Sequence, residues 1–159
     1  MPLRVDVITD SAGTGLPRFG NTTAEVEVHT GNGHGSTNTK IRRFSTVLTD
    51  VGGDIDYAES STLGSSFTIN QDGIYAIDYV ENGAVVTQFA ISKNASDLTA
   101  DPNTLDPSER LGRNNATGFG HIGAIVKLSS GDVIRAHTNA AGNDTTDSVQ
   151  FRIVQLIKL

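Results

Sequence analysis

Alternation of apolar and polar residues, punctuated by Asp-Gly and Gly-Asp pairs, most limits what this chain can fold into. The run 65–79 alternates on both sides of the pair Asp72-Gly73. The run 128–134 contains the pair Gly131-Asp132, and the run 149–156 near the end of the chain repeats the same period. A period of two residues is typical of β-strands, and such pairs are typical of the tight turns beside them. The alternation therefore predicts a protein built of β-strands.

Composition supports an all-β fold, because the 159 residues include 17 glycines and many Thr, Ser, Asn and Asp, with few helix-forming runs. The pair Asn82-Gly83 lies between two alternating runs and predicts a tight hairpin with positive φ at both turn residues. Strands are predicted at residues 23–29, 39–48, 54–59, 66–70, 74–81, 84–93, 119–128, 132–138 and 148–158.

Length and cysteine content indicate one domain that needs no covalent clip. A chain of 159 residues can bury about 68–70% of its unfolded surface. It has no cysteine, which excludes disulfides, thiolate zinc sites and cysteine nucleophiles. We predict an extended arm over residues 1–20 and one domain over residues 21–159. We see no signal peptide and no run near the ~18 apolar residues of a membrane span, so we expect a protein used inside a cell or assembled there into a particle.

The charge balance argues against nucleic acid as a partner. Twelve Lys and Arg stand against 18 Asp and Glu, which gives a net charge of −6, whereas phosphate binding relies on clustered cations. The only basic cluster comprises Lys40, Arg42 and Arg43, and we assign it to a solvated strand face. Neither nucleic acid nor a membrane is an expected partner.

Strand parity predicts which side chains are buried. Tyr75, Ile77 and Tyr79 share one face of their strand, which we place inward. The last strand is apolar on both faces, with Val149, Phe151, Ile153 and Ile157 on one and Val154 and Leu156 on the other. Such a strand is either central between layers or part of a subunit contact, and both readings stay open.

The segment 94–118 is the longest break in the strand pattern. It holds Pro102 and Pro107, and one helical turn is expected from Asp106 through Arg110. Long loops in compact domains often bind something, so we predict a recognition loop; a solvent loop that closes the end of the sandwich is the alternative. The residues expected to contact a partner here are Asp97, Asp101, Arg110 and Arg113.

Chemistry-bearing residues lack the spacing of a catalytic or metal site. Asp97, Asp101 and Asp106 do not follow a calcium-loop register, and the four histidines are scattered. The run 118–123 matches a dinucleotide-binding glycine pattern but leads into a strand and not into a helix. We expect no cofactor, no bound metal and no enzymatic activity.

The order of motifs resembles the trimeric jelly roll of the tumour-necrosis-factor and complement globular-head family. Phe67-Thr68 precedes Gly73-Ile74-Tyr75, then Leu128-Ser129-Ser130-Gly131-Asp132 and an aromatic last strand containing Phe151. The resemblance implies a homotrimeric, single-domain jelly-roll β-sandwich of two antiparallel sheets. It also implies that four aromatic residues fill the core or the trimer contact: Tyr75, Tyr79, Phe119 and Phe151.

Residues 7–20 resemble a lead-in that recurs in structural proteins of tailed bacteriophages. Combined with the jelly roll, this implies a capsid decoration, or cement, protein on the virion surface whose partner is the major capsid protein. A receptor-binding or carbohydrate-binding knob of a phage tail or cell-surface appendage is the alternative. In the arm, the implied capsid contacts are Pro2, Leu3, Arg4, Pro17 and Phe19.

Overall fold

The computed structural model describes residues 24–140 and 149–159. The predicted arm, with Pro2, Leu3, Arg4, Pro17 and Phe19, lies outside the described residues. The described part contains eight strands and no helix. These are β1 (Glu25–His34), β2 (Arg42–Val51), β3 (Ile55–Ala58), β4 (Ser66–Ile69), β5 (Gly73–Lys93), β6 (Arg110–Leu128), β7 (Val133–Thr138) and β8 (Gln150–Lys158).

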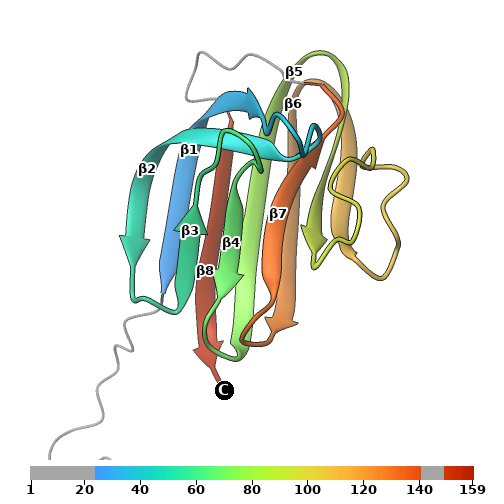
Figure 1. Ribbon diagram of the computed structural model, residues 1–159. Coiled ribbons are helices and arrows are strands. Elements are labelled where there is room, and N and C mark those ends of the chain that lie inside the picture. The colour runs from blue at the N-terminus through green and yellow to red at the C-terminus, as the bar shows by residue number, and fades with distance from the viewer. Residues whose placement is uncertain (1–23, 141–148) are drawn as a thin grey trace, which may run out of the picture.

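All strand pairings are antiparallel, and hydrogen bonds join the eight strands in the order β2-β1-β8-β5-β7-β4-β3, with β6 beside β5. The first part of β5, from Gly73 to Val80, pairs with β8. Its last part, from Phe89 to Lys93, pairs with β7, and β6 accompanies both parts. The β5–β6 ribbon therefore arches from one layer into the other (Figure 1). The two predicted sheets are thus layers of one continuous sheet.

The predicted hairpin at Asn82-Gly83 is wrong, because β5 continues through both residues. Asn82 pairs with Phe119 and Gly83 with Gly118, and neither Asn82 nor Gly83 has positive φ. The register shifts between Gly83 and Thr87, and a Cβ at Gly83 would collide with the Thr87 side chain. The register shift is a β-bulge, which bends the long strand, and Gly83 allows the close approach of Thr87 at this bend.

The predicted loop over 94–118 is too long. Strand pairing with β5 resumes at Arg110, which lies opposite Ser92, so the loop covers only residues 94–109. The expected helical turn is absent: the Glu109 amide donates to the Asp106 carbonyl at 3.0 Å in an isolated turn. The residues from Arg110 onward therefore form a strand paired with β5, although the local sequence favours turns.

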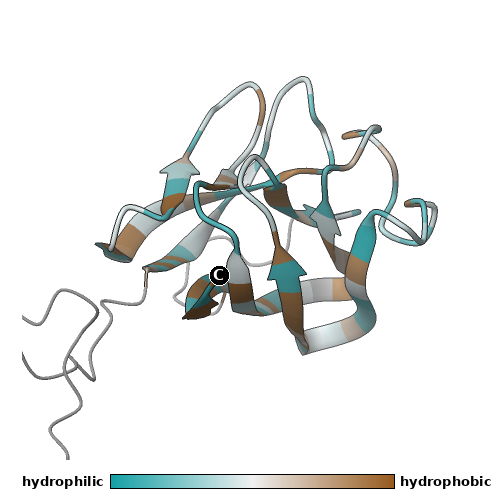
Figure 2. Cartoon of the chain, turned by 90° about the horizontal axis from the view of Figure 1, so that it is seen from below, coloured by the Kyte–Doolittle hydropathy of each residue, from teal (hydrophilic) through white to brown (hydrophobic). Residues whose placement is uncertain are grey.

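Aromatic rings from both layers meet in the core. Phe67 of β4 stacks on Phe151 of β8 with ring centroids 4.5 Å apart, and Tyr79 meets Phe89 edge-on at 5.4 Å. The strands carry alternating hydrophobic and hydrophilic bands (Figure 2). This alternation buries one side chain in two and leaves the other on the outer surface.

Candidate functional site

The outward-facing surface of β8, β5 and β6 is the candidate functional site, which we call the outer face. It consists of Ile74, Ala76, Asp78 and Val80 of β5, Phe119, His121, Gly123, Ile125 and Lys127 of β6, and Gln150, Arg152, Val154 and Ile157 of β8. The pairing register sets these residues side by side: Ala76 lies opposite both Ile125 and Val154, and Ile74 lies opposite Ile157.

Large apolar side chains of the outer face are open to solvent. Ile125 is 75% exposed, Phe119 is 70% exposed and Ile157 is 55% exposed. Isolated exposed apolar residues are ordinary, but neighbouring ones on the same sheet face indicate a contact surface. The surface therefore has the composition of a protein–protein contact.

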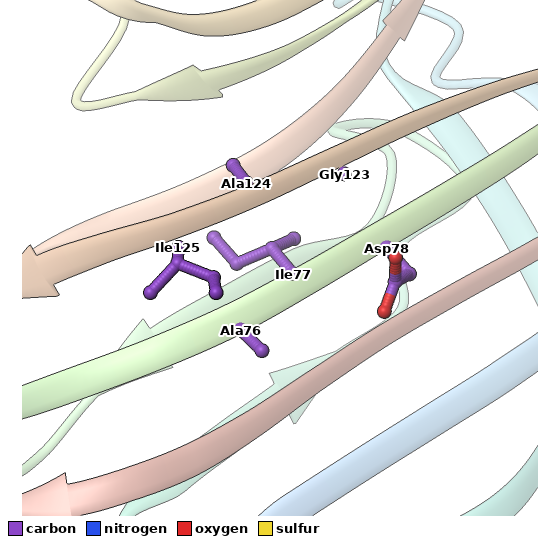
Figure 3. A pocket seen from close by; sticks show the side chains of 6 residues that line it. All are labelled: Ala76, Ile77, Asp78, Gly123, Ala124 and Ile125. Carbon is purple, nitrogen blue, oxygen red and sulfur yellow. The ribbon is translucent and has the colours of Figure 1, made fainter.

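A shallow depression of about 380 Å³ lies between β5 and β6 on this side of the sheet. Its lining consists of Ala76, Ile77, Asp78, Gly123, Ala124 and Ile125. Figure 3 shows these residues on the two neighbouring strands, with β8 and β1 beyond β5. The small side chains beside Ile125 leave room that a partner's apolar side chain can occupy.

Polar and charged side chains border the apolar part of the outer face. His121 Nε2 lies 3.0 Å from Asp78 Oδ1, and both side chains are about half exposed. Arg152 Nε donates to Glu25 Oε1 at 2.8 Å and lies 3.8 Å from Glu27. The hydrogen bond that Arg152 donates to Glu25 raises the pKa of Arg152 above its ordinary value. In the register, the row of Asp78 and Arg152 lies between the apolar cluster around Ile125 and the more distant Phe119, so polar side chains limit that cluster on one side.

Of the four aromatic residues predicted for the core or the trimer contact, three are buried in the core and one is exposed on the surface. Tyr75, Tyr79 and Phe151 are 0% exposed and lie inside the subunit, so they are not available to a partner. Phe119 lies on the outer face and fills no core position. Sequence reasoning missed Ile125 and Ile74, although the alternation Phe119-His121-Gly123-Ile125 marks one face of a strand.

Ile157 also lies on the other side from the predicted one. A register shift between Ile74 and Tyr75 makes Gln155 pair with Tyr75 and Ile157 with Ile74. The extra residue moves Ile157 out of the core face that Phe151 and Ile153 share. Gln155, 2% exposed, takes the inner position and donates to the Tyr75 hydroxyl at 2.9 Å.

The loop residues predicted to meet a partner are held by local hydrogen bonds. Asp97 accepts from Thr99, and Asp101 forms an ion pair with Lys40 at 2.8 Å. Arg110 and Arg113 lie at the start of β6 and not in the loop. Their side chains reach back to the loop, Arg110 to the Leu105 carbonyl at 3.5 Å and Arg113 to Asn103 at 3.1 Å.

The predicted position of Arg42 on a solvated strand face is wrong. Arg42 is 0% exposed and donates two hydrogen bonds to Glu81, each 3.0 Å long. The Tyr79 hydroxyl donates to Glu81 Oε2 at 2.5 Å. Burial raises the pKa of Tyr79 well above its ordinary value, so the phenol stays a donor. The network belongs to the core and not to a binding surface.

Within residues 24–140 and 149–159, no three His, Asp or Glu side chains converge as metal ligands. No helix in this part of the chain is long and apolar enough to cross a membrane. His137 is 0% exposed, and burial lowers its pKa to about 4.

Strand order, antiparallel pairing and the two layers define an all-β, single-domain jelly roll of the tumour-necrosis-factor-like kind. Solved structures of this fold include bushbaby GITRL, with a TM-score of 0.56 and 13% identity over 87% of this chain and 97% of that chain. Murine APRIL at pH 8.0 has a TM-score of 0.57 and 13% identity over 85% of this chain and 100% of that chain. No protein-family model and no curated protein sequence matches the chain. The likeness therefore establishes the fold.

Proposed function

We propose that this protein is a homotrimeric capsid decoration protein that associates through the outer face, binds the major capsid protein on a virion surface and catalyses no reaction. One observation carries the self-association: Ile125 and Ile157, 75% and 55% exposed, lie on one sheet face beside Ile74, Ala76 and Val154. Burying such side chains stabilises an assembly by about 25 cal/mol per Å² of apolar area, before association costs.

The resemblance in sequence to the trimeric jelly-roll family implies an assembly of three copies. The likeness in fold to tumour-necrosis-factor-like proteins supports this number. The outer face covers three adjacent strands, β8, β5 and β6. Its edge strand β6 pairs only with β5 within the described chain, so a neighbouring copy can also cover that edge. A trimer would therefore remove both exposed apolar surface and an open strand edge.

The capsid contact is assigned to the arm over residues 1–20, to Asp97 and Asp101 of the loop, and to Arg110 and Arg113 at the start of β6. The resemblance of residues 7–20 to phage structural proteins supports the arm. Loop residues Pro102 and Leu105 are buried, which anchors the loop on the domain and leaves its polar side chains outward. A loop anchored in this way presents a fixed surface to a large partner.

Sedimentation equilibrium of the full chain and of Ile125→Arg tests the trimer. We expect the wild-type protein to have three times its 16.8 kDa subunit mass, and the variant to have the mass of one subunit. Leu63→Arg is the matched control, since Leu63 is 56% exposed but lies in a turn away from the outer face. A wild-type monomer at micromolar concentration would refute the trimer.

Co-sedimentation with undecorated capsids tests the capsid contact. We expect the full chain to sediment with capsids, and a chain that lacks residues 1–20 to remain trimeric and stay in the supernatant. If the full-length trimer does not bind capsids, the decoration function is wrong while the trimer stands.

A further inference from the structure

A polar hollow at the base of the loop carries a second inference. It has a volume of about 390 Å³ and is lined by Asn103 of the loop and by Arg113, Asn114 and Asn115 of β6. The hollow lies on the first part of β6, before the arch, whereas the β6 residues of the outer face follow the arch. The two surfaces are therefore distinct parts of the strand.

Hydrogen bonds fix how the side-chain amides of the hollow are oriented. Arg113 Nη1 donates to Asn103 Oδ1 at 3.1 Å, and a guanidinium can only donate. The Asn115 backbone N–H donates to Asn114 Oδ1 at 2.8 Å, and Asn114 Nδ2 donates to the His121 carbonyl at 3.1 Å. Each partner has a single possible role, so the assignment of oxygen and nitrogen in Asn103 and Asn114 is forced.

The same hydrogen bonds leave the hollow rich in donors. They engage the amide oxygens of Asn103 and Asn114, while the amide nitrogen of Asn103 donates to no group in the described part of the chain. The Asn115 side chain makes no hydrogen bond within the described residues, and Arg113 uses one of its five N–H donors. Such a surface fits a ligand that carries several acceptor oxygens.

The charge of the hollow is a single cation. Among the described residues, Arg113 is the one charged residue that lines it, and none of these lining residues is acidic. Of the acidic residues in the loop, Asp101 is paired with Lys40 and Asp106 Oδ1 accepts from Ser108. Arg113 has no carboxylate partner within the described part of the chain, so its guanidinium is available to an anion.

We propose that this hollow binds the carboxylate of an acidic sugar residue in a polysaccharide. A guanidinium holds a planar carboxylate through two parallel hydrogen bonds, and the amide groups of Asn103 and Asn115 suit the ring hydroxyls. One cation balances one carboxylate. A polyphosphate or nucleic acid brings several charges, which the net charge of −6 on the protein repels. This inference goes beyond the proposed function, since it needs neither a trimer nor a capsid.

Titration of the full-length protein with D-glucuronate, followed by ¹H–¹⁵N NMR, tests the inference. We expect the side-chain signals of Arg113, Asn103 and Asn115 to shift with saturation in the millimolar range, and D-glucose to bind at least tenfold more weakly. Arg113→Gln should weaken glucuronate binding at least tenfold. Arg43→Gln is the matched control because it also removes one positive charge but lies on β2, and it should leave binding unchanged.

Two further titrations, with inorganic phosphate and with acetate, test whether the site is specific for a sugar. Binding of either ion as tight as that of glucuronate would show a general anion site and overturn the saccharide assignment. Equal binding of glucose and glucuronate, or unchanged binding by Arg113→Gln, would overturn the role of the guanidinium. Shifts elsewhere with none in the hollow would refute the site itself.

Discussion

Arg42 and Glu81 form an ion pair with both side chains fully buried, joined by two parallel hydrogen bonds of 3.0 Å. They lie 39 residues apart, on β2 and β5. The Tyr79 hydroxyl donates a third hydrogen bond to the Glu81 carboxylate, and the Asn82 backbone N–H donates a fourth. Two charges removed from water are tolerated only when each meets the other with good geometry, which this arrangement provides.

Glu81→Gln should lower the free energy of unfolding by about 3–5 kcal/mol, because it leaves the Arg42 guanidinium buried without a counter-charge. Urea denaturation at one protein concentration measures the loss. Arg43→Gln is the control: its ion pair with Glu59 is partly exposed, and the change should cost about 1 kcal/mol or less. A loss for Glu81→Gln no larger than the control would contradict the role of the pair.

The variants Phe151→Ala and Phe119→Ala should separate stability from association. Phe151 is 0% exposed and stacks on Phe67, so its truncation should cost about 3–5 kcal/mol of unfolding free energy. Phe119 is 70% exposed, so its truncation should leave the near-UV circular dichroism of the subunit unchanged and weaken the trimer in sedimentation equilibrium. Intact assembly of Phe119→Ala would remove this residue from the interface.

His137 should make the protein less stable as the pH falls. The ring is buried beside β5, and burial lowers its pKa from 6.5 to about 4. A hydrogen bond with the Ala100 backbone and the charge of Asp97 oppose this shift, and the charge of Arg135 adds to it. Because the unfolded chain takes up the proton first, stability is complete above pH 6.5 and declines toward pH 4, by about 3 kcal/mol in total.

Urea denaturation of His137→Leu between pH 7 and pH 4 checks this dependence. The variant should lose less stability over that range than the wild type does. His121→Gln is the control, since His121 is exposed on the outer face. Parallel pH profiles of wild type and His137→Leu would show that His137 does not carry the effect.

Gly120→Ala should destabilise the arch of β6. A Cβ at Gly120 would lie 2.5 Å from Phe89 Cζ and 2.7 Å from Ala116 Cβ, and Phe89 is fully buried. Displacing core atoms typically costs about 1–3 kcal/mol. Gly123→Ala is the matched control on the same strand, because its nearest neighbour, Asp78 Oδ1, is 3.4 Å away. Thermal unfolding should distinguish the two variants, and equal midpoints would contradict the close approach.

Local alternation was sufficient to predict much of the fold. The two-residue period places Tyr75, Ile77 and Tyr79 on one strand face, and the structure buries all three. The candidate site was less accessible to sequence reasoning. Phe119 was predicted as a contact residue because it is aromatic. Its position on the outer face depends on the pairing of β6 with β5, which joins residues 110–128 to residues 73–92.

The amino-acid sequence by itself determined the β-class, the approximate strand positions and which side of most strands is apolar, because these follow from period-two patterns within a few residues. Tertiary structure decided that β5 continues through Asn82-Gly83, that Arg42 is buried against Glu81 and that Arg113 meets Asn103. Each of these depends on which distant segments pair and in which register. One extra residue in a strand, as before Ile157, moves the side chains beyond it to the opposite face of the sheet.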